Sequence, residues 1–292
     1  MNLIKKLLKE LLFSPFNLLN ILGKLYGGIL NIIKPNLGLM WIDKQLDFIK
    51  KQEKTIVHKL NNKDIKIRIY TPNWVCRYRA DTFSSKEPET LKWIDEYGGD
   101  GPLLDIGANV GLYSIYYAIT KNSNVFAFEP SFFNLSLLAR NINRNNVTKK
   151  IKIFPIPLSN RNGTSTFTLS NTDEGGALSA FGVNYGQDGK ELNRELQYQL
   201  YGLKLDDLFS QKYLNEYPRL IKIDVDGTEH LILYGARKLL KNKKVKSILV
   251  EVNEDFKEQS DNVARILKLS GFKLLEKHHC VNNFYNQIWI KK

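Results

Sequence analysis

Residues 103–111, with the sequence Leu103-Leu104-Asp105-Ile106-Gly107-Ala108-Asn109-Val110-Gly111, decide the fold of this 292-residue chain. The short apolar run ends in glycine, and a segment with helical periodicity follows at once. Glycine at 107 and at 111 permits a tight turn and lets a ligand approach the backbone closely. Asn109 can cap the helix or contact that ligand directly. We therefore predict a strand, a tight turn and a helix, with a ligand site at the turn.

The same alternation of strand and helix continues along the chain. Apolar runs predict strands at 103–106, 125–128, 151–154, 220–224, 247–251, 272–275 and 286–290, and helices are predicted at 112–119, 134–143, 230–240 and 262–269. Strands that alternate with helices indicate parallel pairing with helical crossovers. We expect an α/β fold with a doubly wound, mostly parallel sheet, a C-terminal antiparallel hairpin and an N-terminal helical extension.

The bulk composition is that of a globular protein with an excess of positive charge. Hydrophobic residues make up 43% and charged residues 25% of the chain, which excludes a disordered chain or a fibre. Cys76 and Cys280 lie far apart without metal-ligand spacing, so we expect neither a zinc finger nor a disulfide scaffold, and a reducing cytoplasmic setting. The net charge of +13 favours anionic partners. The basic residues show no pattern typical of nucleic-acid binding, so no nucleic acid is expected.

We place a boundary near residue 60. Residues 1–60 are predicted to form a helical extension, and residues 61–292 the main domain. The extension contains ten basic and four acidic side chains, so part of the positive charge is concentrated there.

Two helices are predicted within residues 1–33. Apolar residues at i, i+3 and i+4 in Met1–Phe13, with lysines on the other side, predict a basic amphipathic helix. Ser14-Pro15 is typical of the start of a second, more apolar helix, which Pro35 ends. Polar residues interrupt the apolar stretch, so we expect no membrane span. Two interpretations stay open: the apolar stripe packs on the protein's own core or on a second copy of the chain, or it lies in a membrane interface.

A carboxylate ends the second predicted strand, at Glu129-Pro130. At this place it can accept hydrogen bonds from both hydroxyl groups of a ribose. The turn at 107–111 lacks the third glycine of a dinucleotide-binding motif and the Lys-Ser/Thr of a P-loop. A nucleoside cofactor without phosphate fits this pattern better, and we expect S-adenosylmethionine.

Several segments of the sequence resemble the FkbM-type S-adenosylmethionine-dependent methyltransferases. The resemblance covers roughly residues 74–255. The matching segments are Leu103 to Ser114, Phe126 to Pro130, Leu158-Ser159-Asn160 before the turn at 161–163, and Ile221-Lys222-Ile223-Asp224-Val225-Asp226-Gly227-Thr228-Glu229 with Gly235-Ala236 after it.

The resemblance implies a class I methyltransferase fold, which is Rossmann-like. It also implies action on a hydroxyl group, often of a sugar or glycan. Family members commonly carry glutamate where this chain has Asp226, which is shorter by one methylene group. The residues expected at the cofactor are Asp105, Gly107, Asn109, Gly111, Glu129 and Ser159.

Acidic residues follow the strand predicted at 220–224. Methyl transfer to a hydroxyl group requires alignment, exclusion of water and removal of a proton. Asp224 and Asp226 lie close in sequence, so repulsion could raise the pKa of one of them and make it a general base. Glu229 is a further catalytic candidate. Helix capping by Asp224 and a favourable first-turn charge at Glu229 remain alternative roles.

Glu251 ends the next strand and is the fourth catalytic candidate. Together with Asp224 and Asn253 it could form an oxygen-only site for a divalent cation, which the spacing leaves open. His230 is interpreted as a core histidine.

A polar, glycine-bearing insertion runs from Thr164 to Asp206. Long connections in compact domains are often functional, so it is either a lid that binds the acceptor or a plain surface loop. Upstream, Arg77 and Arg79 could meet an anionic acceptor.

These features together predict an S-adenosylmethionine-dependent O-methyltransferase. Its expected acceptor is a sugar, a glycan or another small molecule with a hydroxyl group. We expect it in the cytoplasm, and the membrane interpretation of residues 1–33 would place it at the inner membrane face. Two alternatives stay open: a nicotinamide-dependent oxidoreductase, and a catalytically inactive protein of the same fold that docks to a membrane or a partner.

Overall fold

The computed structural model describes residues 20–280 and 282–291, and the chain divides into two compact units, Met1–Gln52 and Glu53–Lys292. The amphipathic helix predicted at Met1–Phe13 and the helix start at Ser14-Pro15 lie outside the described residues. Residues 20–33 are helical, and the predicted end of this helix before Pro35 is confirmed.

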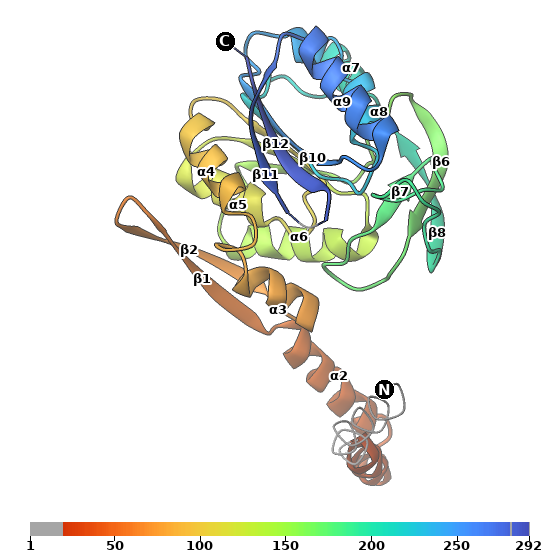
Figure 1. The fold of residues 1–292 in the computed structure, drawn as a ribbon. Coiled ribbons are helices and arrows are strands. Elements are labelled where there is room, and N and C mark those ends of the chain that lie inside the picture. The colour runs from red at the N-terminus through yellow and green to blue at the C-terminus, as the bar shows by residue number, and fades with distance from the viewer. Residues whose placement is uncertain (1–19, 281, 292) are drawn as a thin grey trace. The chain divides into compact units, whose positions relative to one another are not determined.

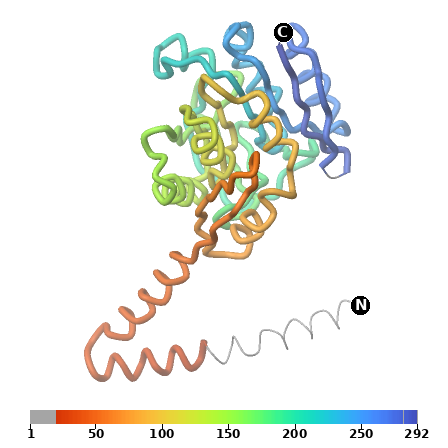
Figure 2. Tube along the Cα trace, turned by 90° about the vertical axis from the view of Figure 1, so that its left-hand side faces the viewer, coloured from red at the N-terminus to blue at the C-terminus, as the bar shows by residue number. Residues whose placement is uncertain are grey.

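A second helix of the first unit, α2 (Leu37–Lys50), was not predicted. It follows the helix at 20–33 after a turn at 34–36, and the tube in Figure 2 shows the two helices meeting there. Within the part of the chain that the structure describes, no helix has the length and apolar character needed to cross a membrane.

The second unit is built around a seven-stranded sheet with the order β11-β12-β10-β9-β3-β4-β5 (Figure 1). The strands β10, β9, β3, β4 and β5 run parallel, whereas β12 pairs antiparallel with β10 and β11. The predicted doubly wound, mostly parallel sheet with a C-terminal hairpin is confirmed. Its strands are β3 (Leu103–Ile106), β4 (Val125–Phe128), β5 (Ile151–Phe154), β9 (Leu220–Ile223), β10 (Ser247–Asn253), β11 (Lys273–His279) and β12 (Phe284–Ile290).

Helices cover both faces of this sheet (Figure 1). One face carries α4 (Pro88–Tyr97), α5 (Leu112–Thr120) and α6 (Phe132–Arg144), and the other carries α7 (Leu205–Ser210), α8 (Glu229–Tyr234) and α9 (Lys257–Leu269). In β3, Leu103 packs into the core on the face covered by α4, α5 and α6. Leu104 and Ile106 pack into the core on the opposite face. A strand buried on both faces is apolar throughout, which explains why continuous apolar runs predicted these strands.

The helix predicted over 230–240 is wrong as a continuous element. α8 ends early, and the 3₁₀ turn η1 (Leu239–Lys241) follows after a break. Asp206 accounts for this break, because its backbone N–H donates to the carbonyl oxygen of Gly235 at 2.9 Å. Its carboxylate accepts from the two backbone N–H groups that lead into η1. The side chain of Asp206 therefore starts a new helical turn.

A hairpin that was not predicted opens the second unit. β1 (Glu53–Leu60) and β2 (Lys63–Tyr70) pair antiparallel around Asn61 and Asn62. Both asparagines are left-handed, with φ of 48° and 63°. Two left-handed residues form the type I′ turn that suits a tight hairpin, and asparagine is one of the residues that adopt it readily.

The insertion from Thr164 to Asp206 is largely ordered. β6 (Gly163–Leu169), β7 (Ser179–Phe181) and β8 (Leu196–Gly202) form an antiparallel sheet in the order β7-β6-β8. One side of this sheet buries a small core of Phe167, Leu169 and Phe181. The insertion is therefore a small sheet with two long connections rather than a plain surface loop.

Candidate active site

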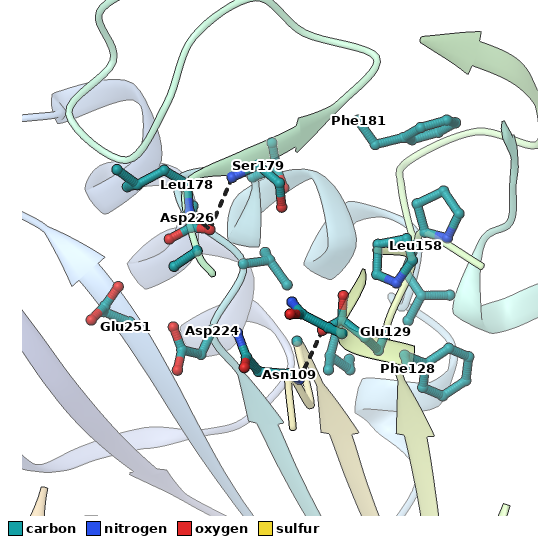
Figure 3. Close-up of a pocket in the computed structure, with 18 of the residues that line it drawn as sticks. Asn109, Phe128, Glu129, Leu158, Leu178, Ser179, Phe181, Asp224, Asp226 and Glu251 are labelled. Atoms are coloured by element: carbon teal, nitrogen blue, oxygen red, sulfur yellow. Dashed lines mark hydrogen bonds between the residues drawn. The ribbon is translucent and has the colours of Figure 1, made fainter. Parts of the chain in front are cut away.

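A cavity of about 320 Å³ lies at the carboxyl ends of β3, β4, β9 and β10 (Figure 3). This is the edge of a doubly wound sheet at which ligands bind. The insertion contributes to its wall, from Gly176 to Phe181. Six of the predicted site residues line the cavity: Gly107, Asn109, Glu129, Asp224, Asp226 and Glu251.

The turn after β3 brings two strand ends into contact. Gly107 has a φ of 81°, and a Cβ placed on it would lie 1.8 Å from the carbonyl oxygen of Asp224. Only glycine allows this approach. The backbone N–H groups of Gly107 and Ala108 both donate to the carbonyl oxygen of Phe128 at 3.0 Å. The turn is therefore bound to the end of β4, next to Glu129.

Glu129 is held rigidly at the cavity wall. Its Oε2 accepts from the backbone N–H of Asn109 and its Oε1 from that of Ser131, both at 2.8 Å. Burial raises the pKa of Glu129 to about 7, although these backbone hydrogen bonds oppose the rise. The side chain of Asn134 is also hydrogen-bonded to this carboxylate and lowers its pKa. A carboxylate has about four acceptor positions, so the group can still accept from the hydroxyl groups of a ribose.

Asn109 has a buried polar atom that lacks a partner. Its Nδ2 donates to the carbonyl oxygen of Gly176 at 2.7 Å, whereas its Oδ1 is buried and unpaired among the described residues. Buried acceptors are normally satisfied. A donor group on a ligand in this cavity would satisfy it, so Asn109 and Glu129 fit a nucleoside cofactor such as S-adenosylmethionine.

Three residues predicted at the cofactor do not line the cavity. Asp105 is buried, and its Oδ2 accepts from the hydroxyl of Ser114 at 2.5 Å. Gly111 serves helix packing, because a Cβ there would lie 2.5 Å from the Leu138 side chain. Ser159 pairs through its backbone N–H with Leu203, and its neighbour in sequence, Leu158, lines the cavity instead.

Asp224 forms a buried ion pair with Lys222. The Lys222 Nζ is 2.8 Å from Asp224 Oδ2, and its side chain is only 3% exposed, whereas that of Asp224 is 33% exposed. Burial raises the pKa of Asp224, but the Lys222 ammonium outweighs this effect and holds the pKa below its ordinary value. Asp224 is therefore ionised at neutral pH and open to the cavity.

Glu251 lies on the neighbouring strand and has the opposite tendency. Burial raises its pKa well above the ordinary value, and the negative charge of Asp224 raises it further. The cavity therefore places an ionised carboxylate next to a carboxyl group that tends to hold its proton.

Asp226 fastens the insertion over the cavity. Its Oδ2 accepts from the backbone N–H groups of Leu178 and Ser179, at 2.8 and 3.2 Å (Figure 3). Asp226 and Leu178 are both left-handed, with φ of 60° and 65°. Burial raises the pKa of Asp226 to about 6, with a further contribution from the charge of Asp224. Through these contacts, Asp226 holds the segment around Leu178 and Ser179 in place over the cavity.

Glu229 is turned away from the cavity. It is fully buried and accepts from the backbone N–H groups of Val225 and Gly227, at 3.1 and 3.2 Å, and from the side chain of Gln259. These contacts shape the turn that presents Asp226. We therefore assign no step of the reaction to Glu229.

Other side chains hold the segment 173–179 in place. In α3 (Trp74–Asp81), Arg79 donates from Nε to the carbonyl oxygen of Gly175 at 2.7 Å. Asn134 accepts from the backbone N–H of Gly175 at 2.9 Å. Arg79 also lines the cavity, whereas Arg77 pairs with Asp81 on the exposed side of α3.

Lys222 and Asn134 are functional candidates that the sequence-based prediction missed. Lys222 interrupts the otherwise apolar strand β9. A charged residue in a strand buried on both faces must be paired, so this interruption was a usable signal. Asn134 lies in the first turn of α6 among polar and apolar residues, and no sequence pattern distinguishes it.

The structure gives no support to a cation site at Asp224, Glu251 and Asn253. Asn253 donates from Nδ2 to Gln187 and accepts at Oδ1 from Asp255, so both ends of its amide are occupied. In residues 20–280 and 282–291, no group of three or more His, Cys, Asp or Glu side chains is arranged to hold a metal ion. His230 is buried, as expected of a core residue, and burial lowers its pKa.

The solved structures similar to this chain include two methyltransferases and a protein named TYW2. The FkbM methyltransferase from Methylobacillus flagellatus is 16% identical, with a TM-score of 0.47, over 66% of this chain and 44% of its own. TYW2 from Pyrococcus horikoshii, in complex with MeSAdo, is 14% identical with a TM-score of 0.42, over 82% and 72%. The precorrin-6y C5,15-methyltransferase from Geobacter metallireducens is 12% identical with a TM-score of 0.42, over 71% and 89%.

The chain thus spans less than half the length of the Methylobacillus protein that it matches. The comparison with curated protein sequences returned no significant match. The family model for the methyltransferase FkbM domain matches residues 105–274, which include the turn after β3, Glu129, the two aspartates that follow β9, and Glu251 of β10. The chain therefore belongs to the FkbM methyltransferase family and has the class I fold of an S-adenosylmethionine-dependent methyltransferase.

Proposed function

We propose that this protein transfers the methyl group of S-adenosylmethionine to a hydroxyl group of a sugar or glycan. One observation carries the proposal: the ionised Asp224, paired with Lys222, opens into the same cavity as the Glu129 carboxylate and the unpaired Asn109 oxygen. The cavity therefore combines groups suited to a nucleoside with a proton acceptor.

The chain's own residues hold the cofactor. Glu129 accepts the ribose hydroxyls, and the Oδ1 of Asn109 accepts a donor group of the ligand. Gly107 lines the cavity and lets the turn after β3 lie close to the backbone of Asp224. When bound, S-adenosylmethionine supplies a methyl group that is already activated on a sulfonium.

Asp224 is the proposed proton acceptor. The proton of a hydroxyl group becomes acidic as its oxygen forms the new bond to carbon, so an ionised carboxylate with a low pKa can take it late in the reaction. Lys222 keeps Asp224 ionised and oriented. Glu251, which tends to stay protonated, is a hydrogen-bond donor beside it. Such a pair suits the neighbouring hydroxyl groups of a sugar, because each hydroxyl both donates and accepts.

The acceptor is proposed to enter beside Lys86 and Glu87. Both line the cavity together with Arg79, and a smaller adjoining cavity is lined by the same three residues. Lys86 is half exposed and lies 2.7 Å from Glu87. Two cationic side chains at the entrance suit an acceptor that carries a carboxylate or phosphate group.

The experiment that tests the proposal is the substitution Asp224→Asn. We expect turnover, measured as release of S-adenosylhomocysteine with candidate glycans, to fall on the order of a hundredfold. Cofactor binding in calorimetry should persist, and Asp188→Asn, at an exposed position, is the matched control. Unchanged turnover in Asp224→Asn would rule out its role as the base. Binding of NADH in place of S-adenosylmethionine would support the oxidoreductase instead.

We also propose that the protein works in the cytoplasm, at the inner face of a membrane. Both Cys76 and Cys280 are free thiols, which suits a reducing compartment. The apolar and basic composition of residues 1–33 supports contact with a membrane surface.

A further inference from the structure

The helix at residues 20–33 has two contrasting sides. At 3.6 residues per turn, Asn20, Lys24, Gly27 and Asn31 fall on one side. The opposite side is apolar, and each of its side chains is at least half exposed, up to 86% for Ile32. These side chains are Ile21, Leu22, Leu25, Ile29, Ile32 and Ile33.

This helix contacts α2 through its small and polar side. The backbone N–H of Gly38 donates to Asn31 Oδ1 at 2.8 Å, and a Cβ on Gly38 would lie 2.3 Å from the carbonyl oxygen of Gly27. Tyr26 and Trp41 meet edge to face, with ring centroids 5.3 Å apart. Small residues that let two helix backbones approach are typical of helix pairs in lipid.

The hairpin is therefore apolar on the outside. Two helices that pair in water bury their apolar sides against each other, because this removes apolar surface from water. Here the contact is made by glycine and asparagine together with one edge-to-face ring pair, Tyr26 and Trp41. The apolar side of residues 20–33 points away from α2. Such an arrangement is stable where the surroundings of the hairpin are themselves apolar.

The residues around the turn between the helices have exposed apolar side chains and almost no charge. From residue 25 to residue 42, Lys34 is the only charged residue, and Leu39, Met40 and Ile42 of α2 are exposed. Residues 37–42 span about 9 Å along the helix. This length matches the roughly 5–10 Å to which interfacial helices enter a bilayer. Charged residues of α2 begin only at Asp43.

The charge of this segment selects the kind of bilayer. Residues 20–52 contain five lysines and two aspartates, and residues 1–52 contain eight lysines and three acidic residues. A basic segment next to an apolar surface favours anionic lipids.

We infer that residues 20–42 form a helical hairpin that docks the protein on the surface of an anionic lipid bilayer. The turn at 34–36 and the apolar side of residues 20–33 enter the boundary between headgroups and acyl chains. This inference deepens the proposed membrane location, names α2 as part of the contact, and does not depend on the identity of the methyl acceptor.

Co-sedimentation of the full chain with lipid vesicles tests the inference. Binding is expected with mixed phosphatidylcholine and phosphatidylglycerol vesicles, and should be at least about tenfold weaker with phosphatidylcholine alone. The double variant Ile32→Ser/Ile33→Ser should bind the mixed vesicles on the order of a hundredfold more weakly. Leu269→Ser, at an apolar position of α9 that is 75% exposed, is the matched control and should bind like the parent chain.

Calorimetry with S-adenosylmethionine on the same samples separates this inference from the proposed function. Vesicle binding without cofactor binding would contradict the proposed enzymatic function and would still support the hairpin inference. No binding to mixed vesicles, or equal binding by the double variant, overturns the hairpin inference. The inference is also overturned if the parent chain sediments as a dimer without binding vesicles and the double variant is a monomer. In that case the apolar side covers a second copy of the chain.

Discussion

The affinity for S-adenosylmethionine should depend on pH through Glu129. The pKa of this carboxyl group is raised to about 7 by burial, and the proposed contact to the ribose hydroxyls requires its ionised form. At pH 6 only about one molecule in eleven carries the ionised group, whereas at pH 8 about nine in ten do. If only the ionised form binds, the dissociation constant should be about tenfold higher at pH 6 than at pH 8.

Titration calorimetry at pH 6, 7 and 8 measures this change. Near pH 7, binding should release about half a proton, which appears as a dependence of the heat on the buffer's ionisation enthalpy. The ligand favours the ionised form of Glu129, so binding lowers the pKa of this carboxyl group. The affinity for the ligand therefore increases as the pH rises.

Two variants isolate the contribution of Glu129. Glu129→Gln should bind more weakly at every pH and lose most of the pH dependence. Glu216→Gln, whose carboxylate pairs with Asn124 outside the cavity, should behave like the parent chain. Equal affinities at pH 6 and pH 8 in the parent chain would refute the reasoning.

Two further predictions concern Lys222 and Asp226. Lys222→Met should lower the free energy of unfolding in urea by about 2 kcal/mol, which is less than is usual for a broken buried pair because Asp224 is partly exposed. Lys204→Met breaks a pair with Asp207 in which the lysine is 37% exposed, and should cost less than about 1 kcal/mol. Equal losses would contradict the argument from the burial of Lys222. Asp226→Ala should speed amide hydrogen exchange at Leu178 and Ser179 and raise the dissociation rate of S-adenosylmethionine about tenfold. Asp226→Asn keeps an acceptor oxygen and tolerates a left-handed φ, so its exchange and dissociation rates should lie between those of the parent chain and the alanine variant. Unchanged exchange in the alanine variant would show that another contact holds the segment 173–179.

Local pattern identified the central sheet because its strands are buried on both faces. Leu220-Ile221 and Leu103-Leu104 are apolar for this reason, and glycine marks the turn that follows β3. The β1–β2 hairpin was missed, although Ile65, Ile67 and Ile69 alternate with charged residues and two asparagines precede them. The alternation typical of a half-exposed strand is therefore present in residues 63–70.

The sequence alone determined which residues stand at the strand ends, and therefore that Gly107, Asn109, Glu129, Asp224 and Glu251 would meet at one edge of the sheet. Parallel strands bring their carboxyl ends together whatever the connections are. Which way each side chain points was decided by tertiary structure. Asp226 turns toward the insertion because its backbone is left-handed. Glu229 points inward and accepts hydrogen bonds from three donors. Lys222 pairs with Asp224 beneath the cavity. The contact of Asp226 with Leu178 and that of Glu229 with Gln259 join segments 48 and 30 residues apart, so no local spacing encodes them. The Lys222–Asp224 pair is local in sequence, but the burial of Lys222 depends on the packed sheet.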